Sequence, residues 1–366
     1  MIRSEALIIG GGPAGSVAAM RLARAGMRTL LVEKNQEGHD PVCGGFVSAD
    51  ALGLLRRAGI DCDALGGHPV HRMRFQLGAR RLEADLPFPA IGLSRRKLDT
   101  VLLRAARDTG AEVAFGRSAR SLTGAGTVGF ADGRNMATDA IILATGKLNL
   151  RGVERPGESA HGSAKVGLRL ALKPNTVCTA DLEGVIELHL FADGYAGLVL
   201  QEDGNLNLCL SVGTQRLRDA GGSPDRLLAM LESEAPLLVQ RVTASVALGG
   251  WSSIARIPYG WRAMETLPGL FRVGDQAAVI ASLAGDGIGI AVASAITASD
   301  ALLKGGPAAA PAYQRDFARR ARRPLAFAEL LRAVAESPGW SRPIARMLSV
   351  RPQVLAWGAS ATRIAA

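Results

Sequence analysis

Aromatic side chains are scarce in this sequence. They make up 4% of its 366 residues, whereas 43 lysines and arginines stand against 33 acidic residues, giving a net charge of +10. Nucleic-acid-binding modules combine basic residues with aromatic ones that stack on bases. No segment here interleaves the two, so the basic balance does not predict a nucleic-acid partner.

Cysteine is also rare. The four cysteines, Cys43, Cys62, Cys178 and Cys209, are far apart, and no two form a CxxC pair. This spacing argues against a zinc site and a disulfide framework, and it suits a reducing cytoplasm. The sequence starts with MIRSEALIIGG, which runs directly into a strand-like segment and predicts no signal peptide. We therefore expect no bound metal and a cytoplasmic location.

Long uninterrupted apolar runs are absent as well. Residues 277–299 come nearest, but Asp286 and the glycines around it break the run, so no transmembrane span is predicted. Residues 313–366 contain ten arginines against three acids. A solvated helix face explains this tail, and a peripheral contact with the inner face of the membrane stays open as the alternative. The oligomeric state is open too.

Glycine, by contrast, follows a pattern near the N-terminus. Ala6–Ile9 is a strand-like run, Gly10-x-Gly12-x-x-Gly15 follows at once, and residues 16–25 have a helical pattern. A second β-prone run over residues 29–32 is followed by Glu33. This order is typical of a Rossmann-like dinucleotide site.

Each of these positions has a physical task. Gly10 permits the tight turn, Gly12 lets the backbone approach a pyrophosphate, and Gly15 lets the helix pack close to the strand. Free amides at the helix N-terminus favour the phosphates, and Glu33 can accept hydrogen bonds from a ribose. The motif predicts an adenine dinucleotide without distinguishing FAD from NAD.

Two later segments favour FAD. A strand-like run over residues 270–273 leads into Gly274-Asp275, which would place a carboxylate beside a polyol such as the ribityl chain of FAD. Gly285-Asp286-Gly287 opens a helix predicted over residues 288–303. The N-terminus of that helix would stabilise negative charge on the pyrimidine edge of a reduced flavin.

The segments between these motifs alternate in character. Residues 70–86 predict a hairpin around Gly78, residues 94–109 an amphipathic helix, and residues 185–212 an antiparallel meander. A second GxGxxG over residues 124–129 lies between alternating runs, and Asp132-Gly133 after it predicts a hairpin turn instead of a helix, so no nucleotide site is expected there.

The end of the chain has its own signals. Residues 304–311 are rich in glycine, proline and alanine and predict a linker. The tail after them is predicted to be helical, with interruptions at Pro338, Pro343 and Pro352.

Taken together, the motifs resemble the FAD-dependent oxidoreductases of the p-hydroxybenzoate hydroxylase-like superfamily. Within it, the sequence is most similar to the geranylgeranyl reductase-like branch and to neighbouring bacterial flavin monooxygenases. The resemblance covers about residues 1–305 and rests on GGGPAG with Glu33, Cys43-Gly44-Gly45, SRRKLD, ATG, GYAGLVLQEDGNLNLCLSV, and VGDQA with GDGIGIA. It implies bound FAD, with Arg95 and Asp275 along its phosphate and ribityl portions. The WxWxIP signature of tryptophan halogenases is absent, so halogenation is not expected.

The fold class expected is α/β, and α+β overall. A Rossmann-like FAD-binding domain would comprise residues 1–69, 94–150 and 265–305. An inserted antiparallel-sheet substrate domain would comprise residues 70–93 and 151–264, and residues 306–366 would form a helical C-terminal segment. The residues expected to bind FAD are Gly10, Gly12, Pro13, Ala14, Gly15, Glu33, Lys34, Arg95, Ala119, Thr145, Gly146, Gly274, Asp275, Gly285, Gly287 and Ile288.

Three functions stay open at this stage. We favour an NAD(P)H-dependent monooxygenase that acts on an apolar aromatic or polyketide-like small molecule, with NAD(P)H as a transient reductant. The alternatives are a flavin-dependent reductase of isoprenoid, geranylgeranyl-type double bonds and a flavin electron-transfer protein without its own substrate. Cys43, Gly44 and Gly45 form the candidate catalytic loop, in which the Cys43 thiol either lines the substrate pocket or is a small buried side chain.

Overall fold

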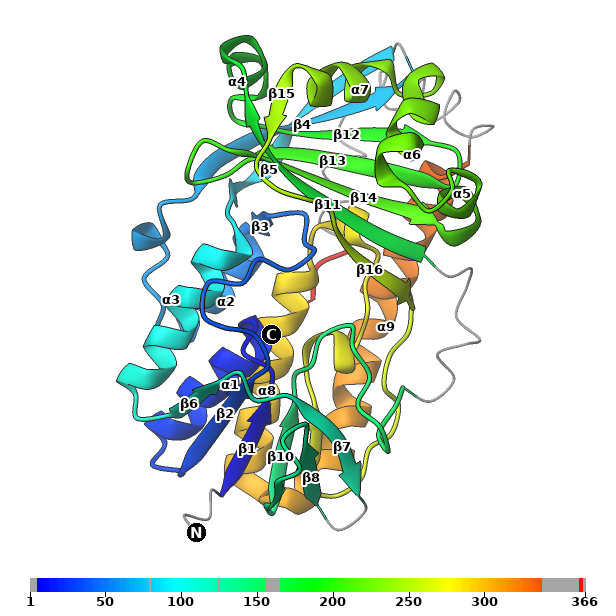
Figure 1. Ribbon diagram of the computed structural model, residues 1–366. Helices are drawn as coiled ribbons and strands as arrows, with labels where there is room; N and C mark the ends of the chain where they lie inside the picture. Colours follow the sequence, from blue (N-terminus) through cyan, green and yellow to red (C-terminus); the bar gives the residue numbers. More distant parts are fainter. Residues whose placement is uncertain (1–4, 79, 124–125, 156–164, 338–361, 365–366) are drawn as a thin grey trace.

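Two large sheets organise the protein, one above the other in Figure 1. The structure is a computed structural model that describes residues 5–78, 80–123, 126–155, 165–337 and 362–364. The lower sheet is parallel, with strand order β17-β10-β1-β2-β6. Its strands are β1 (Ala6–Ile9), β2 (Thr29–Glu33), β6 (Glu112–Phe115), β10 (Ala140–Leu143) and β17 (Leu270–Arg272). β1 and β10 are buried along their whole length, as expected for parallel strands covered on both faces.

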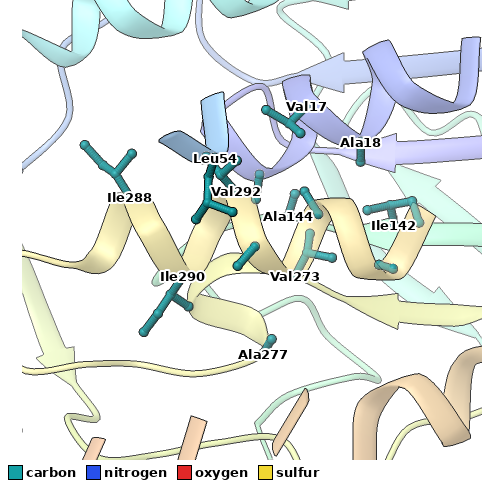
Figure 2. Packing of buried hydrophobic residues seen from close by; sticks show 14 of the residues in the cluster. Val17, Ala18, Leu54, Ile142, Ala144, Val273, Ala277, Ile288, Ile290 and Val292 are labelled. Atoms are coloured by element: carbon teal, nitrogen blue, oxygen red, sulfur yellow. The ribbon is translucent and has the colours of Figure 1, made fainter. Parts of the chain in front are cut away.

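Helix α8 (Gly287–Gly305) is the centre of the lower half. It packs against α1 (Pro13–Arg24), α2 (Ala49–Arg57) and α9 (Ala310–Ala335). Figure 2 shows Ile288 and Val292 of α8 in one cluster with Val17, Leu54 and Val273. By length and composition α8 could cross a membrane, yet 61% of its apolar window is buried inside the protein. Burial on this scale is that of a core helix.

The upper sheet has nine strands and wraps over the lower half (Figure 1). Its order is β15-β11-β14-β13-β12-β4-β5-β3, and β16 pairs with β11 as well. Neighbours are antiparallel except β12 and β4, which run parallel and are separated in the chain by residues 78–184. The strands are β3 (Phe46–Ser48), β4 (His68–Leu77), β5 (Arg80–Gly92), β11 (Lys165–Pro174), β12 (Val185–Phe191), β13 (Gly194–Leu200), β14 (Leu206–Gly213), β15 (Ser245–Ala247) and β16 (Ser252–Ile257).

Short helices cover the outer face of the upper sheet. They are α4 (Thr176–Leu182), α5 (Thr214–Asp219), α6 (Pro224–Met230) and α7 (Pro236–Thr243). Leucines from alternate positions of β11, β13 and β14 meet apolar side chains of these helices in a second core. Alternate burial of this kind turns the remaining residues of each strand toward the lower half.

A buried cluster of ion pairs surrounds Glu187 in the upper sheet. Glu187 on β12 is fully buried and accepts hydrogen bonds from Arg74 Nη1 at 2.8 Å and Arg241 Nε at 3.2 Å. His189 Nε2 lies 3.0 Å from Glu187 Oε1, and Asp181 on α4 pairs with both arginines. We call these five residues the Glu187 cluster.

A small third sheet contains the second GxGxxG motif. β7 (Ala119–Thr123), β8 (Thr127–Phe130) and β9 (Asn135–Ala137) form an antiparallel meander, and no helix follows residues 124–129. The hairpin turn predicted at Asp132-Gly133 is therefore confirmed, because β8 and β9 pair across it.

The end of the chain differs from its prediction. Residues 304–311 are not a linker, because α8 continues to Gly305, a single turn follows over Pro307–Ala309, and α9 begins at Ala310. Buried Tyr313 and Phe317 dock α9 on the core, which holds this stretch in helical form despite its glycines and prolines. The helix even includes Pro324. Pro338, Pro343 and Pro352 lie outside the described residues.

Candidate functional site

The turn from β1 into α1 has the geometry of a phosphate cradle. Gly10 adopts φ +110°, and a Cβ on Gly15 would lie 1.9 Å from the Gly10 carbonyl oxygen. A Cβ on Gly12 would meet only Arg95 Nη2, at 3.1 Å. No side chain caps α1, so its first-turn amides are available to an anion.

Glu33 closes one end of this cradle. Its Oε2 accepts a hydrogen bond from the Gly11 amide at 2.7 Å, and its Oε1 accepts two from Asn35 at 2.9 Å each. These bonds fix the carboxylate beside the glycine turn, where a ribose hydroxyl could also donate to it. The sequence analysis did not predict a role for Asn35, because it considered only Glu33 at the end of this strand.

Arg95 supplies the positive charge beside the cradle. It lies in the first turn of α3 (Arg95–Asp108), which Ser94 caps by accepting a hydrogen bond from the Lys97 amide at 3.0 Å. Its Nε and Nη2 donate to the two carboxylate oxygens of Asp99 at 2.9 and 2.8 Å. Burial opposes the charge, but the ion pair with Asp99 outweighs it and raises the pKa of Arg95. The guanidinium is therefore a fixed cation; its i, i+4 partner could have been noticed in the sequence.

The segment after β10 is tied to the segment after β17. Lys147 Nζ lies 3.1 Å from Asp275 Oδ2, and this attraction raises the pKa of Lys147 against the effect of burial. Arg155 donates to the carbonyl oxygens of Gly146, at 2.6 Å, and of Asp275, at 3.2 Å. Gln276 Nε2 also donates to the Gly146 carbonyl oxygen, at 2.9 Å. Neither Lys147 nor Arg155 was predicted, because only the fold brings them to Asp275.

The N-terminus of α8 enters the same region. Gly285 adopts φ +66°, and a Cβ there would lie 2.9 Å from the Phe46 ring, while Gly287 has open space around it. Asp286 precedes the helix without capping it. Its carboxylate is buried and instead accepts hydrogen bonds from Arg363 Nη1 at 3.2 Å and from the Ile364 amide at 3.3 Å.

The candidate catalytic loop lies between the two sheets. Cys43 is half-buried, and its carbonyl oxygen accepts a hydrogen bond from Asn207 Nδ2 at 3.0 Å. Gly45 has φ +70°, and a Cβ there would lie 2.6 Å from Gln201 Nε2, so glycine is required. Gly44 is exposed. Burial raises the pKa of the nearby Cys209 thiol to about 12, so this second thiol stays protonated.

A chain of hydroxyl groups joins the upper sheet to the segment before α8. Tyr195 Oη and Tyr259 Oη lie 2.5 and 2.7 Å from Ser282 Oγ. Tyr195 Oη also accepts a hydrogen bond from the Leu283 amide at 3.0 Å. Burial raises the pKa of Tyr195 well above its usual value, so its hydroxyl keeps its proton. The sequence could not show this chain, because its members are far apart in the sequence.

Most of the residues described above line one cavity of about 1110 Å³. It reaches from Glu33 past Gly12 and Arg95 to Asp275 and then to the space under the upper sheet. Every residue predicted to bind FAD, including Lys34, Ala119, Thr145 and Ile288, lines this cavity except Gly15, which packs against Gly10. Cys43, Gly44 and Gly45 line it too. This set of groups fits FAD: it combines the uncapped N-termini of α1 and α8 with Glu33 for a ribose and Arg95 for a phosphate. The individual contacts stay predictions.

Metal ligation has no support from the geometry. Within the described ranges, no group of three or more histidine, cysteine or acidic side chains is placed to hold an ion, and the four cysteines are free.

The buried carboxylate of Asp286 predicts a pH effect on stability. Burial raises its pKa to about 6, although Arg363 opposes the shift. A folded-state pKa above the unfolded value of about 3.9 means that the folded protein binds this proton more tightly. The stabilisation is complete below about pH 4 and is lost as the pH rises through about 6, a decrease in unfolding free energy of about 3 kcal/mol.

Asp286→Asn should remove this component, because an amide does not ionise. Urea unfolding of wild type and variant at about pH 5 and about pH 8 measures the difference. Asp316→Asn, which changes an exposed acid on α9, serves as the control. Equal pH dependence of wild type and Asp286→Asn would contradict the assignment.

Comparison with known proteins supports an FAD site at the glycine turn between β1 and α1. Residues 3–140 match the family model described as FAD binding domain. The chain is 26% identical over 321 residues to the menaquinone reductase of Mycolicibacterium smegmatis, covering 83% of this chain and 77% of that protein. It is 33% identical over 122 residues to the menaquinone reductase of Mycobacterium tuberculosis, a match of only 32% of this chain and 30% of that protein.

Solved structures share the fold. The flavin-dependent brominase Bmp2 superimposes with a TM-score of 0.76 at 17% identity, covering 98% of this chain and 94% of that one. A geranylgeranyl bacteriochlorophyll reductase-like protein from Thermoplasma acidophilum superimposes with a TM-score of 0.67 at 19% identity, covering 87% and 82%. The recognition made from the motifs and the expected fold class are confirmed. The protein is a flavoprotein with the fold of the FAD-dependent oxidoreductases, and its residues 3–140 match an FAD binding domain.

Proposed function

We propose that this flavoprotein reduces carbon–carbon double bonds of an isoprenoid chain, with NAD(P)H as the source of electrons. The observation that carries the proposal is the arm of the cavity under the upper sheet. Every side chain that β4, β5, β12 and α9 contribute to it is apolar: Met73, Phe75, Leu77, Leu82, Leu86, Phe88, Ile186, Leu188, Leu190, Phe327, Leu330, Leu331, Val334 and Ala335. Such a lining suits a hydrocarbon.

The names of the relatives support the same class of substrate. Two are menaquinone reductases, and menaquinone carries an isoprenoid side chain. The Thermoplasma structure is named for geranylgeranyl reduction. The sequence favoured oxygenation first; the apolar lining of this arm is our reason for proposing reduction instead.

The chemistry requires a hydride, a proton and a dry pocket. FAD, when bound and reduced, would supply the hydride to one carbon of the double bond. The other carbon must receive a proton, for which Tyr259 Oη, hydrogen-bonded to Ser282 in the cavity wall, is the candidate donor. The apolar arm would exclude water and align the chain.

Oxygenation of an apolar aromatic compound is the second candidate. It is favoured by a relative from Rhodococcus erythropolis named as a probable 2-heptyl-3-hydroxy-4(1H)-quinolone synthase, 29% identical over 40% of each chain. A pure electron carrier is disfavoured, because it would not need an apolar arm beside the cofactor. Exposed Arg319, Arg322 and Arg323 on α9 support a contact with anionic lipid, from which such substrates would come.

Anaerobic reoxidation of the reduced flavin tests the proposal. The FAD-loaded protein is reduced with NAD(P)H or dithionite and mixed with geranylgeraniol without oxygen. Return of the oxidised flavin spectrum, with a product two hydrogens heavier for each bond reduced, is expected. A product that gains oxygen only in air would replace reduction by oxygenation. Failure of every small molecule to speed turnover would favour the carrier.

A substitution in the apolar arm should weaken this turnover. Leu331→Gln places an amide among hydrocarbon side chains, and we expect kcat/KM for geranylgeraniol to fall about tenfold, the effect of about 1.4 kcal/mol. Leu303→Gln is the matched control, because Leu303 is exposed on α8 and does not line the cavity. Equal losses in the two variants would show that the arm does not bind the substrate.

A further inference from the structure

The last described residues of the chain return to the cavity. Thr362 and Ile364 are buried, and Thr362 and Arg363 line the cavity together with Phe46, Phe88 and Gly285. In Figure 1 this short segment is red and lies below the upper sheet, near α8. Nothing in the sequence resemblance covers it.

Arg363 contacts three elements of the fold. Its guanidinium lies over the Phe88 ring of β5, 4.8 Å from the ring centre. Its Nη1 donates to Asp286 Oδ1 before α8 at 3.2 Å, and its Nε lies 3.6 Å from Asp50 Oδ2 on α2. An arginine is suited to this task because it can stack and form ion pairs with one rigid group.

Asp286 completes the attachment from the other side. Its Oδ2 accepts the Ile364 amide, so the carboxylate holds both the side chain and the backbone of the returning segment. Since Asp286 does not cap α8, its hydrogen bonds go to the chain end and to Ser48 Oγ, 3.4 Å away. Because both carboxylate oxygens of Asp286 accept hydrogen bonds from this segment, Asp286 holds residues 363 and 364 in place.

We infer that residues 362–364 form a wall of the active-site cavity beside the N-terminus of α8, and that Arg363 holds this wall and limits which substrates fit. The wall itself follows from the contacts alone. The limit on substrates rests on the proposed function. Arg363 is thus a positioning residue: it holds the wall and leaves the N-terminal amides of α8 facing the cofactor region.

Hydrogen exchange of the FAD-loaded protein tests the wall without any substrate. Arg363→Ala and a chain ending at Ala361 should raise the exchange rate of the residue 287–289 amides about tenfold or more, because a charged hydrogen bond and a covering segment are lost. Iodide should also quench the bound flavin more strongly. Arg363→Lys should keep most of the protection, and Asp316→Asn, on the exposed face of α9, should match wild type.

Unchanged exchange and quenching in Arg363→Ala would overturn the wall. These readouts separate the wall from a general loss of stability, because exchange in β1 and β10, far from the segment, should not change.

The substrate limit needs a second measurement. The ratio of kcat/KM for geranylgeraniol to that for farnesol should rise about tenfold in Arg363→Ala and stay near the wild-type value in Arg363→Lys. A constant ratio with faster exchange would keep the wall and overturn the limit. If wild type reduces neither alcohol, the proposed function fails, and the exchange result still decides whether the wall exists.

Discussion

Gly12→Val is expected to give a folded protein that no longer retains FAD. Gly12 has φ −73° and ψ −175°, an extended conformation that valine adopts readily. The only atom near a Cβ here is the end of the Arg95 side chain, which can move. The added methyl groups would occupy the space beside the first-turn amides of α1, where the pyrophosphate must lie. We expect FAD affinity to fall at least about 100-fold, or about 3 kcal/mol.

The flavin content after purification and a titration of the apoprotein with FAD measure this loss. Gly53→Val is a matched control, because a Cβ on Gly53 of α2 meets nothing within 4 Å. Gly15→Val is not suitable, since a Cβ 1.9 Å from a carbonyl oxygen would disturb the fold itself. Full flavin occupancy in Gly12→Val would show that the cradle has been assigned to the wrong segment.

Glu187→Ala should cause the largest loss of stability. Although burial opposes ionisation, hydrogen bonds from His189, Arg241 and Arg74 hold the pKa of Glu187 well below its usual range. Removing the carboxylate leaves Arg74 and Arg241 buried with too little negative charge. Breaking such a pair costs about 3–5 kcal/mol of unfolding free energy.

Guanidinium unfolding followed by circular dichroism measures this effect. Asp316→Ala is the control, because its pair with Arg319 lies on the exposed face of α9, where a change within about 0.5 kcal/mol is expected. Glu187→Gln should fall between the two, since the amide still accepts a hydrogen bond. If Glu187→Ala is as stable as Asp316→Ala, the cluster does not stabilise the fold.

The local parts of the site were predictable. The first strand, the glycine turn and Glu33 are contiguous, so their spacing alone indicates the cradle, and β1 has the bounds expected. Gly274-Asp275 and Gly285-Gly287 were predicted because each combines a strand end or helix start with glycine. Turn chemistry is encoded within a few residues, and a sequence displays it directly.

The rest depends on contacts between distant segments. Lys147 reaches Asp275 across 128 residues, and Tyr195 reaches Ser282 across 87. Arg363 meets Asp286 across 77 residues, in a tail where arginines are so frequent that none stands out. Residues 304–311 were wrongly predicted to be a linker for the same reason. The helix over residues 310–335 is stabilised by the burial of Tyr313 against distant segments, which the local sequence does not display.

The parallel pairing of β4 with β12 has a consequence for biosynthesis. Residues 68–77 leave the ribosome more than a hundred residues before their partner strand at residues 185–191, and β17, which completes the lower sheet, follows only at residues 270–272. Pairings this distant slow folding. The N-terminal half must therefore wait with unpaired edges, and FAD can be held firmly only once α8 has been translated. Cofactor loading is a late event in the life of the nascent chain, and a shortage of flavin would expose this intermediate to aggregation and proteolysis.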